Sequence, residues 1–158
     1  EDGSIFYSAD YEGGKGNGDI YEAKLVDGSY EVENLGDAIN SSTGEGDPYI
    51  SPDGKMLIFM SWGRPEDLGR GDLYISFKEN GAWKPAVNMG EKINSNKFEY
   101  CPMMSPDGKY FFWTSYRASL LHSKTPRDYN AYIERLEETD NGLGNIYWIK
   151  SEVLETFR

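Results

Sequence analysis

Short apolar runs alternate with turns rich in glycine and proline along most of this chain. Two such runs, Met56–Met60 and Tyr110–Trp113, each follow a Ser-Pro-Asp-Gly tetrapeptide. Runs of this length, with aromatic residues and turn residues at both ends, are typical of β-strands. Pro-Asp-Gly favours a turn, because proline fixes φ at the first corner and glycine takes the positive φ that follows. The pattern therefore predicts β-hairpins.

The hairpin belongs to a longer repeat. The tetrapeptide begins at Ser51 and returns at Ser105, 54 residues later, and the tripeptide 34–36 (Asn-Leu-Gly) returns at 88–90 (Asn-Met-Gly) with the same spacing. Repeats of about 40–50 residues with four short strands each are typical of propeller blades. We predict three blade units in a single domain, of which only the second is complete: residues 1–40, 41–94 and 95–158.

The third strand of each unit begins with an aspartate or asparagine, which is followed by an apolar residue and a tyrosine. These openings are Asp19-Ile20-Tyr21, Asp72-Leu73-Tyr74 and Asn145-Ile146-Tyr147. Turn residues delimit the strands that we expect, which are 4–9, 19–25, 30–35, 47–51, 55–62, 72–78, 83–89, the pair from Tyr100 to Tyr116, and 145–150.

The Ser-Pro-Asp-Gly turn and the Asp-Ile-Tyr strand resemble the repeats of the TolB-like β-propellers. The resemblance implies an all-β fold of four-stranded antiparallel blades, here about three of the six blades of such a propeller. Proteins of this kind serve as binding scaffolds, as periplasmic assembly factors and as appendages of peptidases. The resemblance thus implies a non-enzymatic scaffold for a protein or glycan at the bacterial cell envelope, in the periplasm or outside the cell. The alternative is the propeller part of a glycoside hydrolase-like or peptidase-associated enzyme whose active site lies outside this chain.

The third unit is 20 residues longer than the others between its second and third strands. We assign the extra residues to a helical insertion over 118–143, with Thr125 as N-cap and Pro126 at the first helical position. Tyr129, Tyr132, Ile133 and Leu136 fall on one face of that helix. We expect this face to pack on the propeller and Arg127, Tyr129 and Glu134 to contact a partner. Ser151 is expected to cap a short terminal helix with Val153, Leu154 and Phe157 as its apolar residues.

Two glutamates precede the innermost strands at equivalent positions. Glu45 and Glu99 are 54 residues apart, and Asp47 follows the first by two residues. In a propeller this region borders the central channel, so one hypothesis is an acidic rim that binds a cation or a basic peptide. The other is that these acids only cap loops.

A further set of charged residues recurs once per unit. Asp19, Asp72 and Asn145 begin equivalent strands, and Arg64 and Arg117 end the preceding strand shortly after Ser61 and Ser115. Buried polar groups need hydrogen-bond partners. We therefore predict a structural Ser–Arg–Asp set that ties each glycine-rich loop.

Charge and composition narrow the range of partners. The net charge is −11, with 27 acidic against 16 basic residues, which disfavours nucleic acid. We expect no membrane span and no cofactor. A calcium ion stays open, since the loops 10–19 and 66–72 are acidic and glycine-rich but lack calcium-loop spacing. The single cysteine, Cys101, is expected to be buried, and His122 is the only histidine. Three units leave strand edges open, which predicts self-association.

Overall fold

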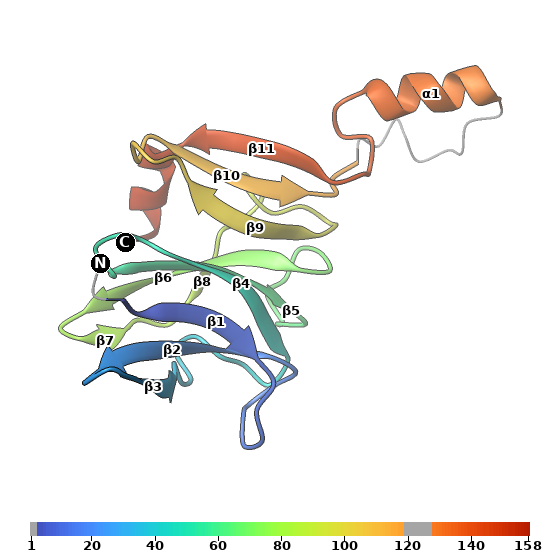
Figure 1. Cartoon of the computed structure of the whole chain (residues 1–158). Helices are drawn as coiled ribbons and strands as arrows, with labels where there is room; N and C mark the ends of the chain where they lie inside the picture. The colour runs from blue at the N-terminus through green and yellow to red at the C-terminus, as the bar shows by residue number, and fades with distance from the viewer. Residues whose placement is uncertain (1–2, 119–127) are drawn as a thin grey trace.

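The computed structural model describes residues 3–118 and 128–158 of the chain. Its strands form three antiparallel sheets that follow one another along the sequence. Figure 1 shows them stacked in chain order, with the first sheet at the bottom and the third at the top. The predicted antiparallel β character is confirmed.

The first sheet is a meander of three strands. It contains β1 (Ile5–Ala9), β2 (Asp19–Val26) and β3 (Ser29–Asn34), in the order β1-β2-β3. The turn between β2 and β3 is Asp27-Gly28, and both residues have positive φ, 50° and 82°. This is the geometry that Asp-Gly hairpins favour, which explains the tight reversal.

The second sheet has five strands. It contains β4 (Gly44–Ile50), β5 (Met56–Trp62), β6 (Asp72–Glu79) and β7 (Ala82–Trp83), and β8 (Val87–Asn88) also pairs with β6. The sequence predicts one outer strand over 83–89, but the structure divides it in two. Pro85 lies in the gap, and its missing N–H prevents continuous pairing. The Ser51–Gly54 turn closes as predicted, since Gly54 N–H donates to Ser51 C=O at 2.8 Å.

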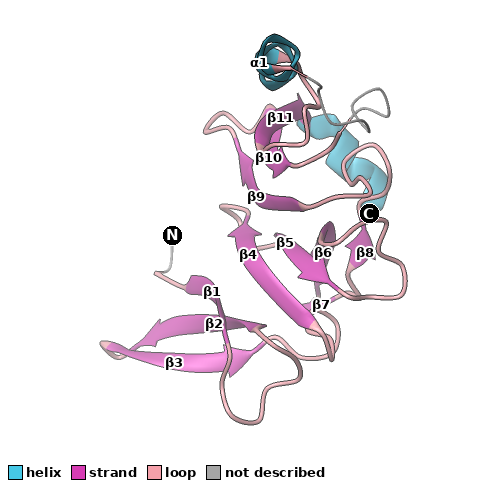
Figure 2. Cartoon of the chain, turned by 90° about the vertical axis from the view of Figure 1, so that its right-hand side faces the viewer, coloured by secondary structure: helices cyan, strands magenta, loops and turns pink. Residues whose placement is uncertain are grey.

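The third sheet has three strands. One helix lies between its second and third strands in the sequence, and another follows the third strand. The sheet contains β9 (Glu99–Met104), β10 (Tyr110–Ser115) and β11 (Asn145–Lys150), in the order β11-β10-β9. The α-helix α1 (Tyr129–Glu137) lies between β10 and β11 in the sequence, and the 3₁₀ helix η2 (Ser151–Phe157) follows β11. Figure 2 shows η2 beside β10 and β11.

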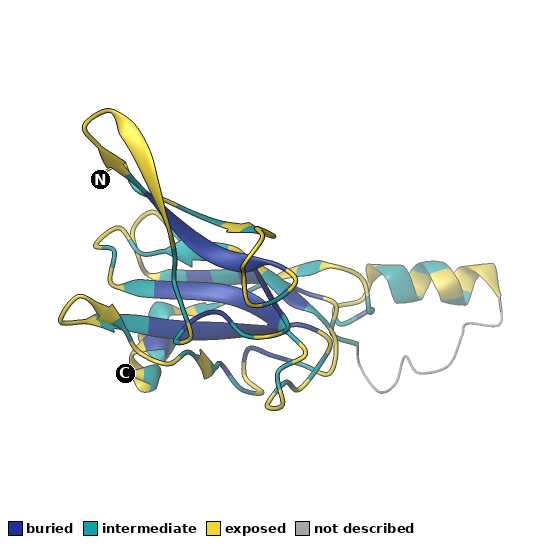
Figure 3. Cartoon of the chain, turned by 90° about the horizontal axis from the view of Figure 1, so that it is seen from below, coloured by how far each residue is buried: buried dark blue, intermediate teal, exposed yellow. Residues whose placement is uncertain are grey.

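Two apolar layers hold the sheets together. Between the first and second sheets, Ile20 packs with Leu57, Phe59 and Tyr74, all of them fully buried. A second layer, between the second and third sheets, contains mainly side chains from β5, β6 and β10, together with Leu154 of η2. Burying a side chain of this size contributes about 1.5–3 kcal/mol. Figure 3 shows the buried residues in the middle of the strands and the exposed ones at the turns.

The helical insertion differs from the prediction in two ways. The N-cap of α1 is Asp128, whose Oδ1 accepts from Ala131 N–H at 2.9 Å, while the expected cap Thr125 lies outside the described residues. The helix also buries none of its residues, and Tyr129 is 75% exposed. Figure 1 shows α1 beyond the ends of β10 and β11, away from the other sheets. The expectation that its apolar face packs on the sheets is therefore wrong for this chain.

The terminal helix keeps its predicted apolar residues but not its predicted cap. Leu154 is buried, and Val153 and Phe157 pack against the same layer. Ser151 is the first residue of η2, and its hydroxyl donates to Gly108 C=O at 2.7 Å. That bond ties η2 to the second Ser-Pro-Asp-Gly turn, which anchors the end of the chain on the third sheet.

Candidate binding site

Glu45 and Glu99 lie at the start of the first strand in the second and third sheets. Both are fully buried. Glu45 Oε2 accepts from Ser41 N–H at 3.0 Å, and its Oε1 accepts from the Ser41 and Ser61 hydroxyls at 2.6 and 3.0 Å. Glu99 accepts from Ser95 and Ser115 in the same way. The expected exposed acidic rim is thus corrected for these two residues, because their oxygens bind the chain's own donors.

Arg64 completes the environment of Glu45. Its guanidinium donates to Glu45 Oε1 at 2.9 Å, to Ser61 Oγ at 2.8 Å and to Ile39 C=O at 2.5 Å. Its Cζ lies 4.5 Å from the ring centroid of Tyr74. Such a buried pair is retained only when further hydrogen bonds offset its desolvation. Arg64 therefore joins the second sheet to the segment that precedes it.

Arg117 has a similar place in the third sheet. It donates from Nε to Ser115 Oγ at 3.2 Å and from its terminal nitrogen to Ile93 C=O at 2.6 Å, and it lies over the ring of Tyr147 at 4.6 Å. The Ser–Arg contact that the repeat suggests is present in both units. The role of these residues is to hold loops, and nothing in the contacts requires a ligand.

The aspartates of the repeat belong to a separate network. Asp72 accepts from Leu68 N–H and Gly69 N–H at 2.7 and 3.1 Å and from Asn88 Nδ2 at 2.7 Å. Asp19 accepts from Lys15 N–H, Gly16 N–H and Asn34 Nδ2 at equivalent positions. Asn145 instead donates to Asn141 Oδ1 at 3.0 Å. The predicted Ser–Arg–Asp set is therefore two sets, because the aspartates turn towards loop N–H groups and not towards arginine.

Asp47 and Cys101 mark equivalent irregularities in β4 and β9. The pairing of each strand shifts register at this point. Both residues have positive φ, 49° and 50°, and each precedes a proline. A residue before proline normally adopts an extended conformation, so each position stores strain of order 1–3 kcal/mol. The bulges bring Asp47 Oδ2 within 3.2 Å of Cys101 N–H and 3.7 Å of its Sγ.

The exposure of these two residues separates them from the buried glutamates. Asp47 is exposed. Cys101 is exposed as well, so the expectation of a buried thiol is wrong: the bulge turns the side chain out of the alternation of the strand. Partial burial, and then the Asp47 carboxylate, raise the pKa of the Cys101 thiol above its ordinary value. A thiol with a raised pKa is a poor nucleophile.

An aromatic pocket of about 340 Å³ opens beside Asp47. Its walls are Asp47, Met60, Phe98, Tyr100 and Tyr116. The rings of Tyr100 and Tyr116 stack with centroids 5.7 Å apart and planes 16° apart, and their hydroxyls are 3.4 Å apart. The hydrogen bond with Tyr116, assisted by desolvation, raises the pKa of Tyr100 to about 12. The Tyr100 phenol is therefore neutral near pH 7, and the hydroxyl groups of both tyrosines offer hydrogen-bond donors and acceptors.

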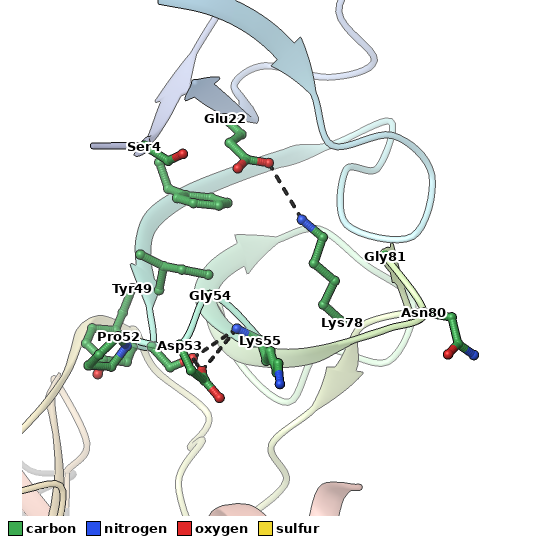
Figure 4. Close-up of a pocket in the computed structure, with 13 residues that line it drawn as sticks. Ser4, Glu22, Tyr49, Pro52, Asp53, Gly54, Lys55, Lys78, Asn80 and Gly81 are labelled. Atoms are coloured by element: carbon green, nitrogen blue, oxygen red, sulfur yellow. Dashed lines mark hydrogen bonds and ion pairs between the residues drawn. The ribbon is translucent and has the colours of Figure 1, made fainter. Parts of the chain in front are cut away.

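A second and larger cleft, of about 680 Å³, lies between the first and second sheets. It is bordered by β1, by Glu22 of β2, by the Ser51–Gly54 turn and by Lys78 of β6. Figure 4 shows Lys78 reaching toward Glu22, whose Oε2 is 3.9 Å from the lysine Nζ. Glu22 occupies the repeat position that Ile75 fills in the second sheet, so a charge replaces an apolar side chain there. The sequence analysis did not predict this cleft, although a glutamate at a repeat position that is otherwise apolar was a signal for it.

The residues predicted in the insertion do not join either cavity. Tyr129 and Glu134 are exposed on α1, which extends beyond the third sheet (Figure 1). Arg127 and His122 lie outside the described residues. The structure thus brings Asp47 into a pocket and leaves Tyr129 and Glu134 on a separate surface.

Metal and membrane chemistry find no further support in the described ranges. No group of three or more His, Cys, Asp or Glu side chains within residues 3–118 and 128–158 is placed to hold a metal ion. The carboxylates of Asp19 and Asp72 accept hydrogen bonds from N–H groups of the glycine-rich loops. In the same ranges, neither α1 nor any other helix has the length and hydropathy needed to cross a bilayer.

Comparison with known proteins adds no constraint on the ligand. No protein-family model matches the chain, and no curated protein matches its sequence. Function has therefore to be argued from the two cavities and their chemistry.

Proposed function

We propose that this chain is a non-enzymatic, TolB-like β-propeller module that binds a glycan at the bacterial cell envelope, in the periplasm or outside the cell. The observation that carries the proposal is the stacked pair of Tyr100 and Tyr116 beside the exposed carboxylate of Asp47. The six-bladed arrangement and the location follow from the resemblance of the repeats.

The arrangement of the sheets supports a propeller. Each sheet begins with an antiparallel meander, and neighbouring sheets in the sequence pack face to face through the same repeat positions. The Ser-Pro-Asp-Gly turns at Ser51 and Ser105 both connect the first strand of a sheet to the second. In a propeller the first strands border the axis, and this would place Asp47 and the aromatic pocket there.

The pocket suits a neutral sugar. Aromatic rings offer flat apolar surface for the C–H face of a pyranose, and their hydroxyls offer donors and acceptors. One Asp47 oxygen is bonded to Cys101 N–H, and the carboxylate keeps free lone pairs for sugar hydroxyls. The volume of the pocket, about 340 Å³, falls in the lower range of small-molecule sites.

The contacts of the other acids argue for binding and not catalysis. Glu45 and Glu99 are bonded to serine and arginine donors of the scaffold. The thiol of Cys101 has a raised pKa. A catalyst needs a group that is free to exchange protons or to attack a substrate. The carboxylates of Glu45 and Glu99 are instead bonded to the scaffold, and the raised pKa keeps the Cys101 thiol protonated.

A basic protein segment is the second candidate ligand, and the net charge of −11 favours it. A lysine or arginine could enter the same pocket, where aromatic faces and a carboxylate both attract a cation. Salt separates the two candidates, because binding of a charged segment weakens with ionic strength and binding of a neutral sugar does not.

The test is titration calorimetry of the purified chain against a panel of neutral oligosaccharides and a panel of lysine-rich peptides, at low and high salt. We expect an oligosaccharide to bind equally at both salt concentrations. Y116A and D47N should each weaken that binding at least tenfold, while Y129A, which removes an exposed tyrosine from α1, should not. Binding of the peptides alone, lost in high salt, would contradict the glycan proposal and support the basic segment.

A further inference from the structure

Each sheet has two faces, which we name by the neighbour they meet along the chain. The preceding face of the second sheet carries Leu57, Phe59 and Tyr74, which pack towards the first sheet. Its following face carries mainly Ile58, Leu73 and Ile75, which pack towards the third sheet. Alternate strand residues point to opposite faces, so this division follows directly from the strand period.

The same junction forms twice within the chain. In the first sheet, Ile20 holds the repeat position of Leu73 and packs on the preceding face of the second sheet. In the third sheet, Phe111 and Trp113 hold the positions of Leu57 and Phe59 and pack on the following face of the second sheet. A following face therefore meets a preceding face at both junctions.

One half of this junction is free on the third sheet. Ile146 and Trp148 hold the positions of Leu73 and Ile75, yet they are 75% and 60% exposed. Trp148 lies opposite Phe112, and Phe112 lies opposite Met103, which is 56% exposed. These side chains form a continuous apolar row across all three strands of the following face.

The other half is free on the first sheet. Ile5, Ala23 and Val32 lie opposite one another in register across β1, β2 and β3, and Ile5 and Val32 are about half exposed (49% and 52%). Leu25 and Tyr30 form a second such row. These two rows, like the row on the third sheet, carry no charge, although the whole chain carries −11. Extended apolar surface of this kind marks an interaction site.

We propose that a second copy of this chain covers both faces. The following face of the third sheet in one copy packs on the preceding face of the first sheet in the other, and two such junctions related by a two-fold axis close the pair. The chain supplies both halves of a junction that it already forms internally, which is the reason for choosing a second copy over a different protein. Two copies of three sheets make six, and the rotation closes the contact so that no open series of copies forms.

The test uses the purified 158-residue chain and sedimentation equilibrium over micromolar concentrations, with circular dichroism to confirm folding. The parent should have twice the chain mass of 17.9 kDa. W148E and V32E each place a charge in both junctions of the pair, so each alone should raise the dissociation constant at least a hundredfold. L68E, which charges an exposed leucine in the 63–71 loop, is the matched control and should stay paired.

Mixing the two variants gives the decisive result. W148E retains an intact preceding face and V32E an intact following face, so an equimolar mixture should form a one-to-one pair through a single unchanged junction. Pairing of V32E alone would show that third sheets pair with each other and would overturn the proposal. A monomeric parent would overturn the proposal, because it is the result expected if other proteins or further repeats cover these faces. Assemblies of more than two copies would overturn it as well. Should W148E unfold, I146K charges the same face at a more exposed position and replaces it.

Discussion

Arg64 donates to the carboxylate of Glu45 at 2.9 Å, and the glutamate is fully buried while the arginine side chain is 12% exposed. The pair links the first strand of the second sheet to the loop after its second strand. It also binds Ile39 C=O in the segment that arrives from the first sheet. The Glu45–Arg64 ion pair therefore stabilises the contact between the first and second repeats.

Glu45→Gln should destabilise the chain, because it leaves the Arg64 charge unpaired in a nearly dry site. We expect a loss of about 2–4 kcal/mol in the free energy of unfolding, or roughly 5–15 °C in Tm. Urea unfolding followed by circular dichroism measures it. Glu79→Gln is the control, since Glu79 forms an exposed pair with Lys84 at 2.9 Å and should cost less than about 1 kcal/mol. Equal losses in both variants would show that Glu45 has no special role.

Gly69→Ala should destabilise the chain more than Gly28→Ala. A Cβ at Gly69 would lie 2.3 Å from Lys97 C=O oxygen and 2.5 Å from that of Ser95, both backbone atoms that cannot move alone. Gly28→Ala meets no atom within 4 Å and bears only the strain of φ +82°. We expect about 1 kcal/mol for Gly28→Ala and at least about twice that for Gly69→Ala. Thermal unfolding compares them, and an equal or milder effect at Gly69 would contradict the close packing of the two loops.

The repeat explains why much of the fold was predictable. Two Ser-Pro-Asp-Gly turns and the strands after them follow from local turn chemistry and strand period, which need no knowledge of distant contacts. The third strand of the third sheet was predicted with its bounds intact, as Asn145–Lys150. The outer strand of the second unit was not, because Pro85 interrupts pairing that depends on a neighbouring strand.

The site was harder to predict, because burial is a property of the assembled sheets. Glu45 and Glu99 have the sequence character of surface acids, and only the folded structure brings Ser61, Ser115 and their loop donors to the carboxylates. Cys101 has the character of a core thiol, and a bulge in β9 turns it outward. Asp47 was predicted as a site residue and lies in the aromatic pocket, but its aromatic neighbours Phe98, Tyr100 and Tyr116 were not predicted.

Cys101 should react slowly with iodoacetamide near pH 8. Its raised pKa leaves less thiolate at that pH than an ordinary cysteine has, and the Asp47 carboxylate contributes to the shift. Asp47→Asn removes that charge, so the pKa should fall and the rate should rise. Rates measured by mass spectrometry from pH 7 to pH 10 give the pKa of each protein. An unchanged pKa in the variant would contradict the contact between Asp47 and Cys101.

Tyr116→Phe should lower the pKa of Tyr100 from about 12 towards its ordinary value of 10.0, because the hydrogen bond with Tyr116 is the main cause of the shift. A tyrosine whose folded pKa is raised is stabilising as the neutral phenol. That stability is complete below pH 10 and declines as the pH rises from about 10 to about 12. Tyrosine ring carbon shifts in NMR titrations follow Tyr100 directly. A Tyr100 pKa that stays near 12 in the variant would show that burial, and not Tyr116, sets it.

The most direct test of glycan binding at the aromatic pocket is a map of NMR chemical-shift changes as a neutral oligosaccharide is added to the labelled chain. We predict that the largest changes fall at Asp47, Phe98, Tyr100, Cys101 and Tyr116, and that Y116A abolishes them. Changes centred instead on Glu22, Lys78 and the Ser51–Gly54 turn would place binding in the other cleft and contradict the account.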